Sequence, residues 1–314
     1  MAESLRVLVS CRLAWDGLDE FAEMFETRHI VIDRPELTGQ ALDEEELLAI
    51  IDSYDGILAG DDELSRVVIE AAPNLKVISK WGVGVDAIDT EAAAERGIAI
   101  FNTPAMFGEE LADYALGYLL LLARKQHVVD REVRAGNWHQ PRGRSLAGLT
   151  LGVVGLGSSG SALARRALAM KMEVLGSDPP LPVERRPPGV RGVDLDELLG
   201  YSDVVSLHLP LTAATQSVID AGAIGRMKPG VWLINTSRGG LVDEEALLRG
   251  LESGQVGAAA LDVFRREPVD ASHPLLRHPN VVVGSHNGSN TGEAVRRTTR
   301  MAVENLIAGL IGEK

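Results

Sequence analysis

A glycine-rich turn between an apolar stretch and an amphipathic one constrains the fold of this chain more than any other feature. The segment reads TLGVVGLGSSGSALARRAL, with Gly155, Gly157 and Gly160 spaced as G-x-G-x-x-G. Residues 151–154 predict a buried strand, and residues 161–170 have the spacing of an amphipathic helix. In this context Gly155 permits a tight turn, Gly157 lets a pyrophosphate approach the backbone, and Gly160 lets helix and strand pack closely. The helix N-terminus adds free N–H groups and a positive dipole end, so the segment predicts a dinucleotide site.

An acidic residue follows the next predicted strand. Residues 172–177 form that strand, and Asp178 comes 23 positions after Gly155. A carboxylate there accepts hydrogen bonds from the adenine ribose hydroxyls and repels a 2′-phosphate, which favours NAD over NADP. Arg185 and Arg186 are near enough in the sequence to reach a phosphate, so NADP stays open. The alternative interpretation of Asp178 is an ordinary turn residue before two prolines.

Short apolar runs alternate with amphipathic stretches along the chain. Such alternation is typical of βαβ units, in which helices cover both faces of a parallel sheet. A long helical stretch at 109–135, followed by the segment AGNWHQPRGRSLAG, separates two series. The predicted strands lie at 5–10, 29–33, 56–59, 77–79 and 98–101, and then at 150–155, 172–177, near 193, and at 204–209, 231–235, 258–263 and 281–283. The predicted fold class is α/β, with two doubly wound parallel sheets.

Composition limits the classes of partner. Acidic residues outnumber basic ones by 45 to 31 and the formal charge is −14, so a nucleic-acid surface is not expected. There is no apolar run of about 18 residues to predict a membrane span, and the N-terminal segment lacks signal-peptide features. Cys11 is the single cysteine, which fits a cytoplasmic protein. No metal site is expected, because His273, His278 and His286 have no usual zinc spacing.

Polar residues follow three predicted strands of the second series. Arg238 follows WLINTS and precedes two glycines, and His286 follows VVVGS, which predicts a buried strand. Asp262 and Glu267 lie within ALDVFRREP. Because carboxyl ends of strands form the ligand edge of an open α/β sheet, these side chains are candidates for one site. A guanidinium suits a carboxylate or a polarised carbonyl, and a histidine suits proton transfer near neutral pH. From the residues alone, Glu267 is equally well a solvated acid, and His286 a satisfied loop histidine.

Longer segments resemble a known family. Similarity to the D-isomer-specific 2-hydroxyacid dehydrogenases extends over GLGSSG, KPGVWLINTSRGGLVDEEALLRGL, GAAALDVFRREP, ISKWGVGVDAIDTEAAAERGI, FNTPA and ALGYLLLLAR. The resemblance covers residues 5–310 and is greatest to the D-3-phosphoglycerate dehydrogenase branch that lacks a C-terminal regulatory domain, so no such domain is expected. It implies a Rossmann NAD-binding domain at 104–288, inserted into a flavodoxin-like substrate domain formed by 1–103 and 289–314.

The resemblance implies an activity and three catalytic residues. The expected reaction is reversible, NAD-dependent hydride transfer between a 2-oxo acid and a D-2-hydroxy acid. Arg238 matches the family's substrate arginine, and His286 matches its acid/base. Glu267 matches the carboxylate that pairs with this histidine, orients its ring and favours the imidazolium. The expected substrate is similar to D-3-phosphoglycerate. The alternatives are a hydroxypyruvate/glyoxylate reductase, a phosphonate-type dehydrogenase and an NAD-sensing corepressor resembling the C-terminal-binding proteins.

The family pattern also places residues around the cofactor and the substrate. Val83 and Gly84 match a loop beside the substrate, and the backbone N–H groups of Gly82 and Gly84 are expected to form an anion-binding nest. Lys80 is equally well a ligand of a phosphate or second carboxylate, or a solvated lysine. The cofactor residues that the pattern implies are Gly155, Gly157, Ser159, Gly160, Asp178, His208, Pro210, Thr215, Thr236, Asp262 and Gly288. Among these, Asp262 is expected to hold the nicotinamide carboxamide.

Several positions depart from the family pattern. Ser285 and Asn287 flank the candidate histidine, where a proline and a small or aliphatic residue are usual. Ala105, Phe107 and Asp113 replace a more usual Gly, Asn and Glu. These departures bear on the choice of substrate more than on the type of reaction.

The resemblance finally implies how the domains and subunits act. A cleft between the two domains is expected to close over NAD and substrate and to exclude water from hydride transfer. A homodimer is expected, with the helix at 109–135 and the segment GNWHQPRGRSL at its interface.

Overall fold

The computed structural model describes residues 4–37 and 39–312, which form two compact units. Unit 1 comprises Met1–Met106 and Asn290–Lys314, and unit 2 comprises Phe107–Ser289. Each unit has its own parallel sheet with helices on both faces. The predicted α/β fold class is therefore confirmed.

The described part of unit 1 is built on a five-stranded parallel sheet of order β2-β1-β3-β4-β5. The strand order reverses between β1 and β3, as in flavodoxin-like folds, and ligands bind at the carboxyl ends of such a sheet. The strands are β1 Leu5–Val9, β2 Ile30–Asp33, β3 Gly56–Ala59, β4 Val77–Lys80 and β5 Ala99–Phe101. The helices are α1 Arg12–Trp15, α2 Ala22–Glu26, α3 Glu44–Leu48, α4 Arg66–Glu70, α5 Thr90–Glu95 and α13 Gly292–Ile311, with 3-10 turns η1 Leu18–Phe21 and η2 Ile51–Ser53.

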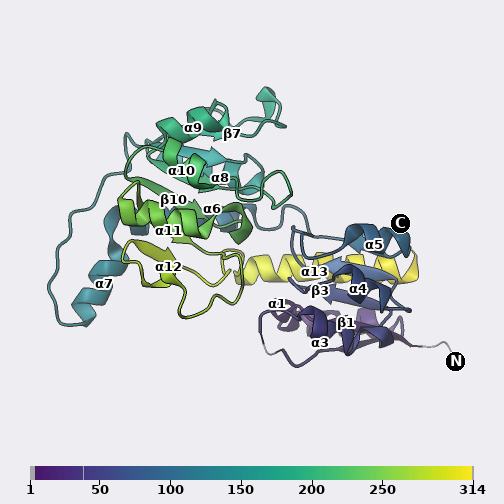
Figure 1. Cartoon of the computed structure of the whole chain (residues 1–314). Helices are drawn as coiled ribbons and strands as arrows, with labels where there is room; N and C mark the ends of the chain where they lie inside the picture. Colours follow the sequence, from purple (N-terminus) through teal and green to yellow (C-terminus); the bar gives the residue numbers. More distant parts are fainter. Residues whose placement is uncertain (1–3, 38, 313–314) are drawn as a thin grey trace. The chain divides into compact units, whose positions relative to one another are not determined.

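Helices cover both faces of the unit 1 sheet. The C-terminal helix α13 (yellow in Figure 1) runs along β3, β4 and β5. The Ser79 hydroxyl of β4 donates to the Ala302 carbonyl of α13 at 2.7 Å. The opposite face packs against α3, α4 and α5, through a core that includes Leu47, Ile57 and Ile69. Burial on both faces explains why these strands are almost continuously apolar.

Unit 2, which is described throughout, has a seven-stranded parallel sheet of order β12-β11-β10-β9-β6-β7-β8. Its order reverses between β6 and β9, as in a Rossmann fold. The strands are β6 Thr150–Val154, β7 Glu173–Ser177, β8 Arg191–Gly192, β9 Val204–Leu207, β10 Val231–Asn235, β11 Val256–Leu261 and β12 Val281–Val283. The helices are α6 Gly108–Arg124, α7 Gln126–Arg134, α8 Ser158–Ala169, α9 Leu195–Tyr201, α10 Ala221–Arg226, α11 Glu244–Ser253 and α12 Pro274–Arg277, with 3-10 turns η3 Val183–Arg185 and η4 Gly239–Leu241.

Small residues let two helices of unit 2 approach each other and the sheet. Ala112 and Ala115 of α6 and Ala162 and Ala164 of α8 are fully buried in one core. The other face carries α9, α10 and α11 over a second core. The glycine turn before α8 is thus held by a sheet that is packed on both sides.

Three sequence-based expectations about elements are wrong in detail. The helix expected at 109–135 breaks at Lys125, which has a left-handed φ of +52°, so α6 and α7 are separate helices. The helical spacing of residues 15–26 predicts one helix, but the structure has η1 and α2 over this range, preceded by α1. The strand β12 pairs only with β11 at the edge of the sheet, and Val283 is 45% exposed, so this strand is not fully buried.

Candidate active site

Two of the three glycines in the turn between β6 and α8 are required sterically, and the third faces open space. Gly155 has a φ of +94°, and a Cβ there would overlap the carbonyl oxygen of His208. A Cβ at Gly160 would overlap the carbonyl oxygen of Gly155. A Cβ at Gly157 would meet nothing within 4 Å, and no side chain caps the N-terminus of α8. The turn therefore presents open backbone and helix N–H groups, as an anion site requires.

Asp178 follows β7 directly and is tied to the same turn. Its Oδ2 accepts the Leu156 N–H at 2.8 Å, whereas Oδ1 has no hydrogen-bond partner among the described residues. One carboxylate oxygen is thus available to ribose hydroxyls. The Arg186 guanidinium packs so closely on β8 that a Cβ at Gly192 would overlap it.

His208 is a buried histidine that links the turn to the sheet. Its Nδ1 lies 3.1 Å from Ser159 Oγ, and its Nε2 lies 2.9 Å from Ser206 Oγ. Burial lowers the pKa of His208 to about 4, so the ring is neutral at physiological pH and fixes the Ser159 hydroxyl at the start of α8. In the loop that follows, Thr215 Oγ1 donates to the Pro210 carbonyl at 2.7 Å.

Thr236, directly after β10, carries a buried hydroxyl that lacks a partner. Its side chain is 4% exposed, and Oγ1 has no hydrogen-bond partner among the described residues. Because an unsatisfied buried hydroxyl costs free energy, it marks a place where a bound group can complete the hydrogen bonding. Together with the open backbone at Gly157 and the available oxygen of Asp178, it makes the residues of unit 2 a good fit for NAD.

The candidate catalytic residues follow three neighbouring strands. Arg238 comes after β10, Asp262 comes directly after β11, and His286 comes after β12. These strands are adjacent and parallel, so the three residues lie at the same carboxyl edge. The chain after Arg238 passes so close to the Phe264 backbone that any Cβ at Gly239 would overlap it. This contact explains the glycine that follows the arginine.

His286 and Glu267 form a direct pair. His286 Nδ1 lies 2.7 Å from Glu267 Oε2, and the two side chains are 20% and 24% exposed. The other oxygen of Glu267 accepts the Phe264 N–H at 2.8 Å, which fixes the carboxylate. Because an ionised carboxylate only accepts, Nδ1 carries the proton of this bond.

Asp262 organises the loop that carries the histidine. Its Oδ1 accepts the Asn287 N–H at 3.1 Å and its Oδ2 accepts the Gly288 N–H at 2.8 Å. Its backbone carbonyl accepts the His286 N–H at 2.7 Å. Asp262 is 1% exposed, so these bonds are shielded from water. The family pattern implies a cofactor contact for Asp262, and the structure adds this role in holding the loop.

Two tyrosines of α6 lie beside Asp262, and sequence reasoning did not assign them to the site. A Cβ at Gly284 would overlap both the Tyr118 hydroxyl and Asp262 Oδ1, so these two groups meet at that glycine. The Tyr114 and Tyr118 hydroxyls are 3.5 Å apart. Burial, with the nearby Asp262 charge, raises the pKa of both tyrosines and keeps them protonated.

In unit 1, the loop after β4 contains the candidate substrate residues. The Gly82 N–H donates to Thr103 Oγ1 at 2.9 Å. The expectation that this N–H binds an anion is therefore wrong. No described residue accepts a hydrogen bond from the N–H of Val83 or Gly84. Val83 is 48% exposed. Lys80 is 3% exposed and lies 3.0 Å from Asp61 Oδ1, so the interpretation of Lys80 as a solvated lysine is wrong.

The described residues form neither a metal-binding set nor a membrane-spanning helix. Within residues 4–37 and 39–312, no three His, Cys, Asp or Glu side chains come together as a set that could hold a metal ion. Over the same residues, no helix is long and apolar enough to span a membrane.

A Rossmann unit with an open glycine turn and a carboxylate-bound histidine at its ligand edge defines a dinucleotide-dependent oxidoreductase. Residues 116–288 match the family model described as "D-isomer specific 2-hydroxyacid dehydrogenase, NAD binding domain". The chain belongs to the D-isomer specific 2-hydroxyacid dehydrogenase family. It is an NAD-dependent enzyme that interconverts 2-oxo acids and D-2-hydroxy acids.

Individual relatives differ in the substrate that their names give. The chain is 41% identical to a glyoxylate reductase of Thermofilum pendens over 282 residues, which covers 86% of this chain and 82% of the relative. It is 40% identical to a D-3-phosphoglycerate dehydrogenase of Archaeoglobus fulgidus over 270 residues, which covers 85% of this chain and 51% of the relative. The structure of a D-lactate dehydrogenase from Aquifex aeolicus, complexed with NAD and lactic acid, matches with a TM-score of 0.87 at 28% identity, and covers 98% of this chain and 96% of that one.

Proposed function

We propose that His286 is the acid/base of this dehydrogenase, that Glu267 orients it, and that Arg238 binds the substrate carboxylate and carbonyl. The 2.7 Å contact between His286 Nδ1 and Glu267 Oε2 is the observation that supports this most directly. The fixed fork of donors on Arg238 suits a 2-oxo acid. Open N–H groups at Val83 and Gly84 support the further proposal that unit 1 receives the substrate and unit 2 the cofactor.

The two directions of the reaction use opposite protonation states of one side chain. In reduction, the His286 imidazolium donates its Nε2 proton to the 2-oxo oxygen; in oxidation, the neutral ring accepts the hydroxyl proton. Glu267 favours the imidazolium, and its bond to the Phe264 N–H keeps the ring in one orientation. NAD, when bound, accepts or supplies the hydride at C2 of the substrate. Within the proposed site, Asp178 binds the adenine ribose, and Ser159 with Gly160 binds the pyrophosphate.

Two substrate classes are supported by the relatives. The sequence pattern favours a D-3-phosphoglycerate-like substrate, and a relative of that name covers most of this chain. The alternative, a glyoxylate or hydroxypyruvate reductase, is supported by a relative that shares more of its own length with the chain. An NAD-sensing corepressor would bind NADH without turnover, so a kinetic assay separates it from both.

The test is loss of NADH absorbance with a panel of 2-oxo acids. His286→Ala is expected to lower kcat by about 10²–10⁴-fold, because the proton donor is lost. NADH binding, measured by fluorescence, is expected to persist. The matched control is His278→Gln at the end of α12, which is expected to keep wild-type turnover. Unchanged turnover in His286→Ala would remove this residue from the mechanism.

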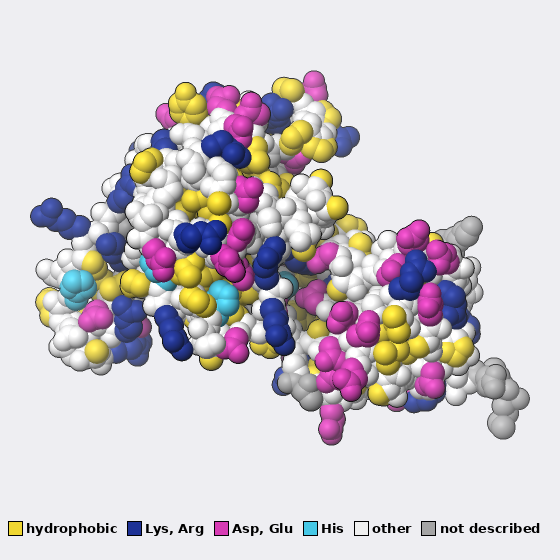
Figure 2. All heavy atoms as spheres, viewed as in Figure 1, with side chains coloured by type: hydrophobic (Ala, Val, Ile, Leu, Met, Phe, Trp, Pro, Cys, Tyr) yellow, Lys and Arg dark blue, Asp and Glu magenta, His cyan; other side chains and the backbone are white. Residues whose placement is uncertain are grey.

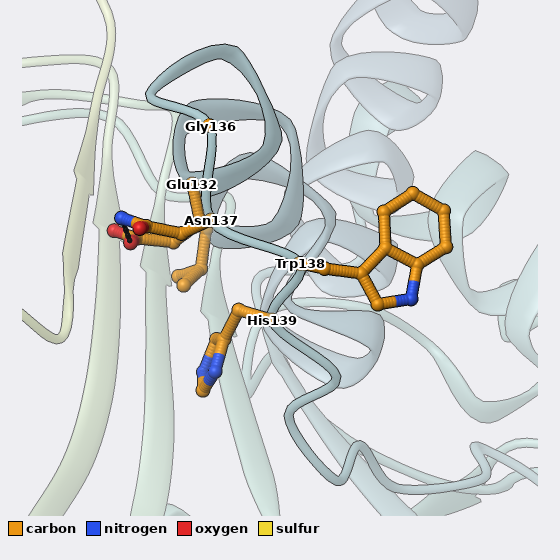
Figure 3. A pocket seen from close by; sticks show the side chains of 6 residues that line it. Glu132, Gly136, Asn137, Trp138 and His139 are labelled. Atoms are coloured by element: carbon orange, nitrogen blue, oxygen red, sulfur yellow. Dashed lines mark hydrogen bonds between the residues drawn. The ribbon is translucent and has the colours of Figure 1, made fainter.

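We also propose that the enzyme is a homodimer, with α7 and the segment at 135–147 at its interface. The helix α7 buries none of its side chains, and Val133 and Trp138 are 44% and 83% exposed. We call α7 and the segment at 135–147 the projecting arm. Figure 3 shows an open pocket on this arm, where Asn137 is bonded to Glu132 and Trp138 points away from both. Exposed apolar side chains on a projecting helix are typical of a protein interface.

A further inference from the structure

A buried ion pair lies at the carboxyl edge of the unit 1 sheet. Lys80, the last residue of β4, is 3% exposed, and its Nζ lies 3.0 Å from Asp61 Oδ1 and 3.2 Å from the Trp81 carbonyl. Asp61 follows β3 and is 39% exposed. The ammonium lies next to the candidate substrate loop, since a Cβ at Gly82 would be 3.1 Å from Nζ. Asp61 therefore forms an ion pair with the Lys80 ammonium, which lies next to this loop.

A second aspartate holds the Asp61 segment in place. Asp62 is 1% exposed, and its Oδ2 accepts the Ser10 hydroxyl at 2.6 Å and the Gly60 N–H at 2.7 Å. Its Oδ1 accepts the Leu42 N–H at 2.8 Å. These bonds fix the turn after β3 to the end of β1. Asp61 is thus presented to Lys80 by a rigid turn.

The rest of unit 1 adds negative charge. By sequence, unit 1 has 25 acidic and 12 basic residues, a net charge of −13, whereas unit 2 has 20 and 19, a net charge of −1. Figure 2 shows Asp and Glu side chains gathered on the visible face of unit 1 around α3. Near the carboxyl edge, Arg12 is exposed at the start of α1 and Arg34 pairs with Asp19. On α13, Arg296 lies 3.4 Å from Glu20 and Arg297 donates to the Met106 carbonyl. A second anionic group on a substrate meets an unfavourable field in this unit.

We propose that Asp61 is a specificity-determining residue that restricts the enzyme to small monoanionic 2-oxo acids, such as glyoxylate and hydroxypyruvate, and excludes a phosphorylated one. This inference rests on the proposed function, in which unit 1 receives the substrate beside the open N–H groups of Val83 and Gly84. A three-carbon substrate held there places its far end well within a Debye length of Asp61. Lys80 does not compensate, because its charge is already matched by Asp61 at 3.0 Å.

The test compares kcat/KM for hydroxypyruvate, glyoxylate and 3-phosphohydroxypyruvate with NADH. In the wild type, hydroxypyruvate is expected to exceed the phosphorylated acid by about 100-fold, because like-charge contacts cost several kcal/mol. Asp61→Asn releases the Lys80 charge and is expected to narrow this ratio about tenfold. The double variant Asp61→Asn/Lys80→Met removes both charges and is expected to keep a ratio near that of the wild type. Asp52→Asn, an exposed charge removal before β3, is the matched control.

The outcomes separate this inference from the function on which it rests. A wild type that reduces 3-phosphohydroxypyruvate as well as hydroxypyruvate overturns the inference and leaves the proposed function intact. The inference is also overturned if Asp61→Asn leaves the ratio of kcat/KM for hydroxypyruvate to kcat/KM for 3-phosphohydroxypyruvate unchanged, while thermal unfolding shows that the variant is folded. If Asp61→Asn does not fold, the wild-type ratio still decides. If no 2-oxo acid is reduced although NADH binds, the proposed function itself fails.

Discussion

His286 has a backbone conformation that histidine rarely adopts. Its φ is +54°, in the left-handed region, and the hydrogen bonds of its own N–H and of the two following N–H groups all go to Asp262. Left-handed non-glycine residues persist where surrounding contacts hold them, and they cluster at functional sites. The neighbours Ser285 and Asn287, which depart from the family pattern, flank this point. The ring is therefore placed by backbone contacts as well as by Glu267.

Replacing Glu267 with glutamine tests the pairing. The variant keeps the size of the side chain but removes the charge that favours the imidazolium, so kcat for reduction is expected to fall by about 10–100-fold. The high-pH limb of the pH–rate profile for reduction is expected to move to lower pH, because the ring holds its proton less firmly. Steady-state kinetics over a pH series measures both effects. A profile that keeps its position would argue against the pair.

The buried ring of His208 makes stability depend on pH. Its pKa is lowered from 6.5 to about 4, so between these values the unfolded chain binds a proton that the folded protein does not. The buried neutral ring of His208 therefore makes its full contribution to the free energy of unfolding above pH 6.5. The free energy of unfolding is expected to fall by up to about 3 kcal/mol as the pH drops to about 4. Urea unfolding of the wild type and of His208→Gln, which does not titrate, measures this contribution. Equal losses in the two proteins would contradict it.

Among the elements, the β6–α8 junction leaves little room for change. Gly160 lies in the first turn of α8, against the Gly155 carbonyl, and β6 is central in its sheet. Helix, turn and strand are thus in contact at a point that has no room for a methyl group. The open backbone of the turn depends on this close approach.

Gly160→Ala tests that junction. The added Cβ would overlap backbone, which cannot move aside cheaply, so a loss of about 1–3 kcal/mol in unfolding free energy is expected, together with weaker NADH binding. The matched control is Gly225→Ala in α10, where a Cβ meets nothing within 4 Å. That variant is expected to be neutral or to gain up to about 1 kcal/mol. Thermal unfolding and NADH titration of the two variants measure the difference; equal behaviour would show that the overlap relaxes.

The order of elements could be predicted from the sequence, because apolar runs and glycine turns are local signals. The ends of elements were less predictable. Lys125 breaks a helix without any glycine or proline to indicate it, and the three valines of β12 look the same whether a strand is central or at an edge. In the site, strand ends located Arg238 and His286. The Glu267 contact spans 19 positions of irregular chain, so residue patterns alone left it open.

At the scale of the whole molecule, the net charge of −14 is distributed very unevenly between the two units. Unit 2 is nearly neutral and carries the dinucleotide turn, whereas unit 1 carries almost all of the net negative charge. Residues 1–106 alone have 22 acidic and 8 basic residues, so the sequence already contains this asymmetry; the fold adds that the C-terminal helix α13 belongs to the same unit. The Lys80–Asp61 pair could not be predicted either, because the sequence does not show that the last residue of β4 pairs with a residue beyond the end of β3.

The projecting arm predicts the oligomeric state. If α7 and Trp138 form the interface, the wild type has twice the 33.6 kDa mass of one chain by light scattering. Val133→Asp with Trp138→Asp is expected to give a single-chain mass, because burying two carboxylates in an apolar contact is unfavourable. The control is Tyr201→Asp, a change at an aromatic residue of α9 that is 60% exposed, and it is expected to leave the dimer intact. A wild type at 33.6 kDa would refute the dimer, and a double variant that stays dimeric would place the interface elsewhere.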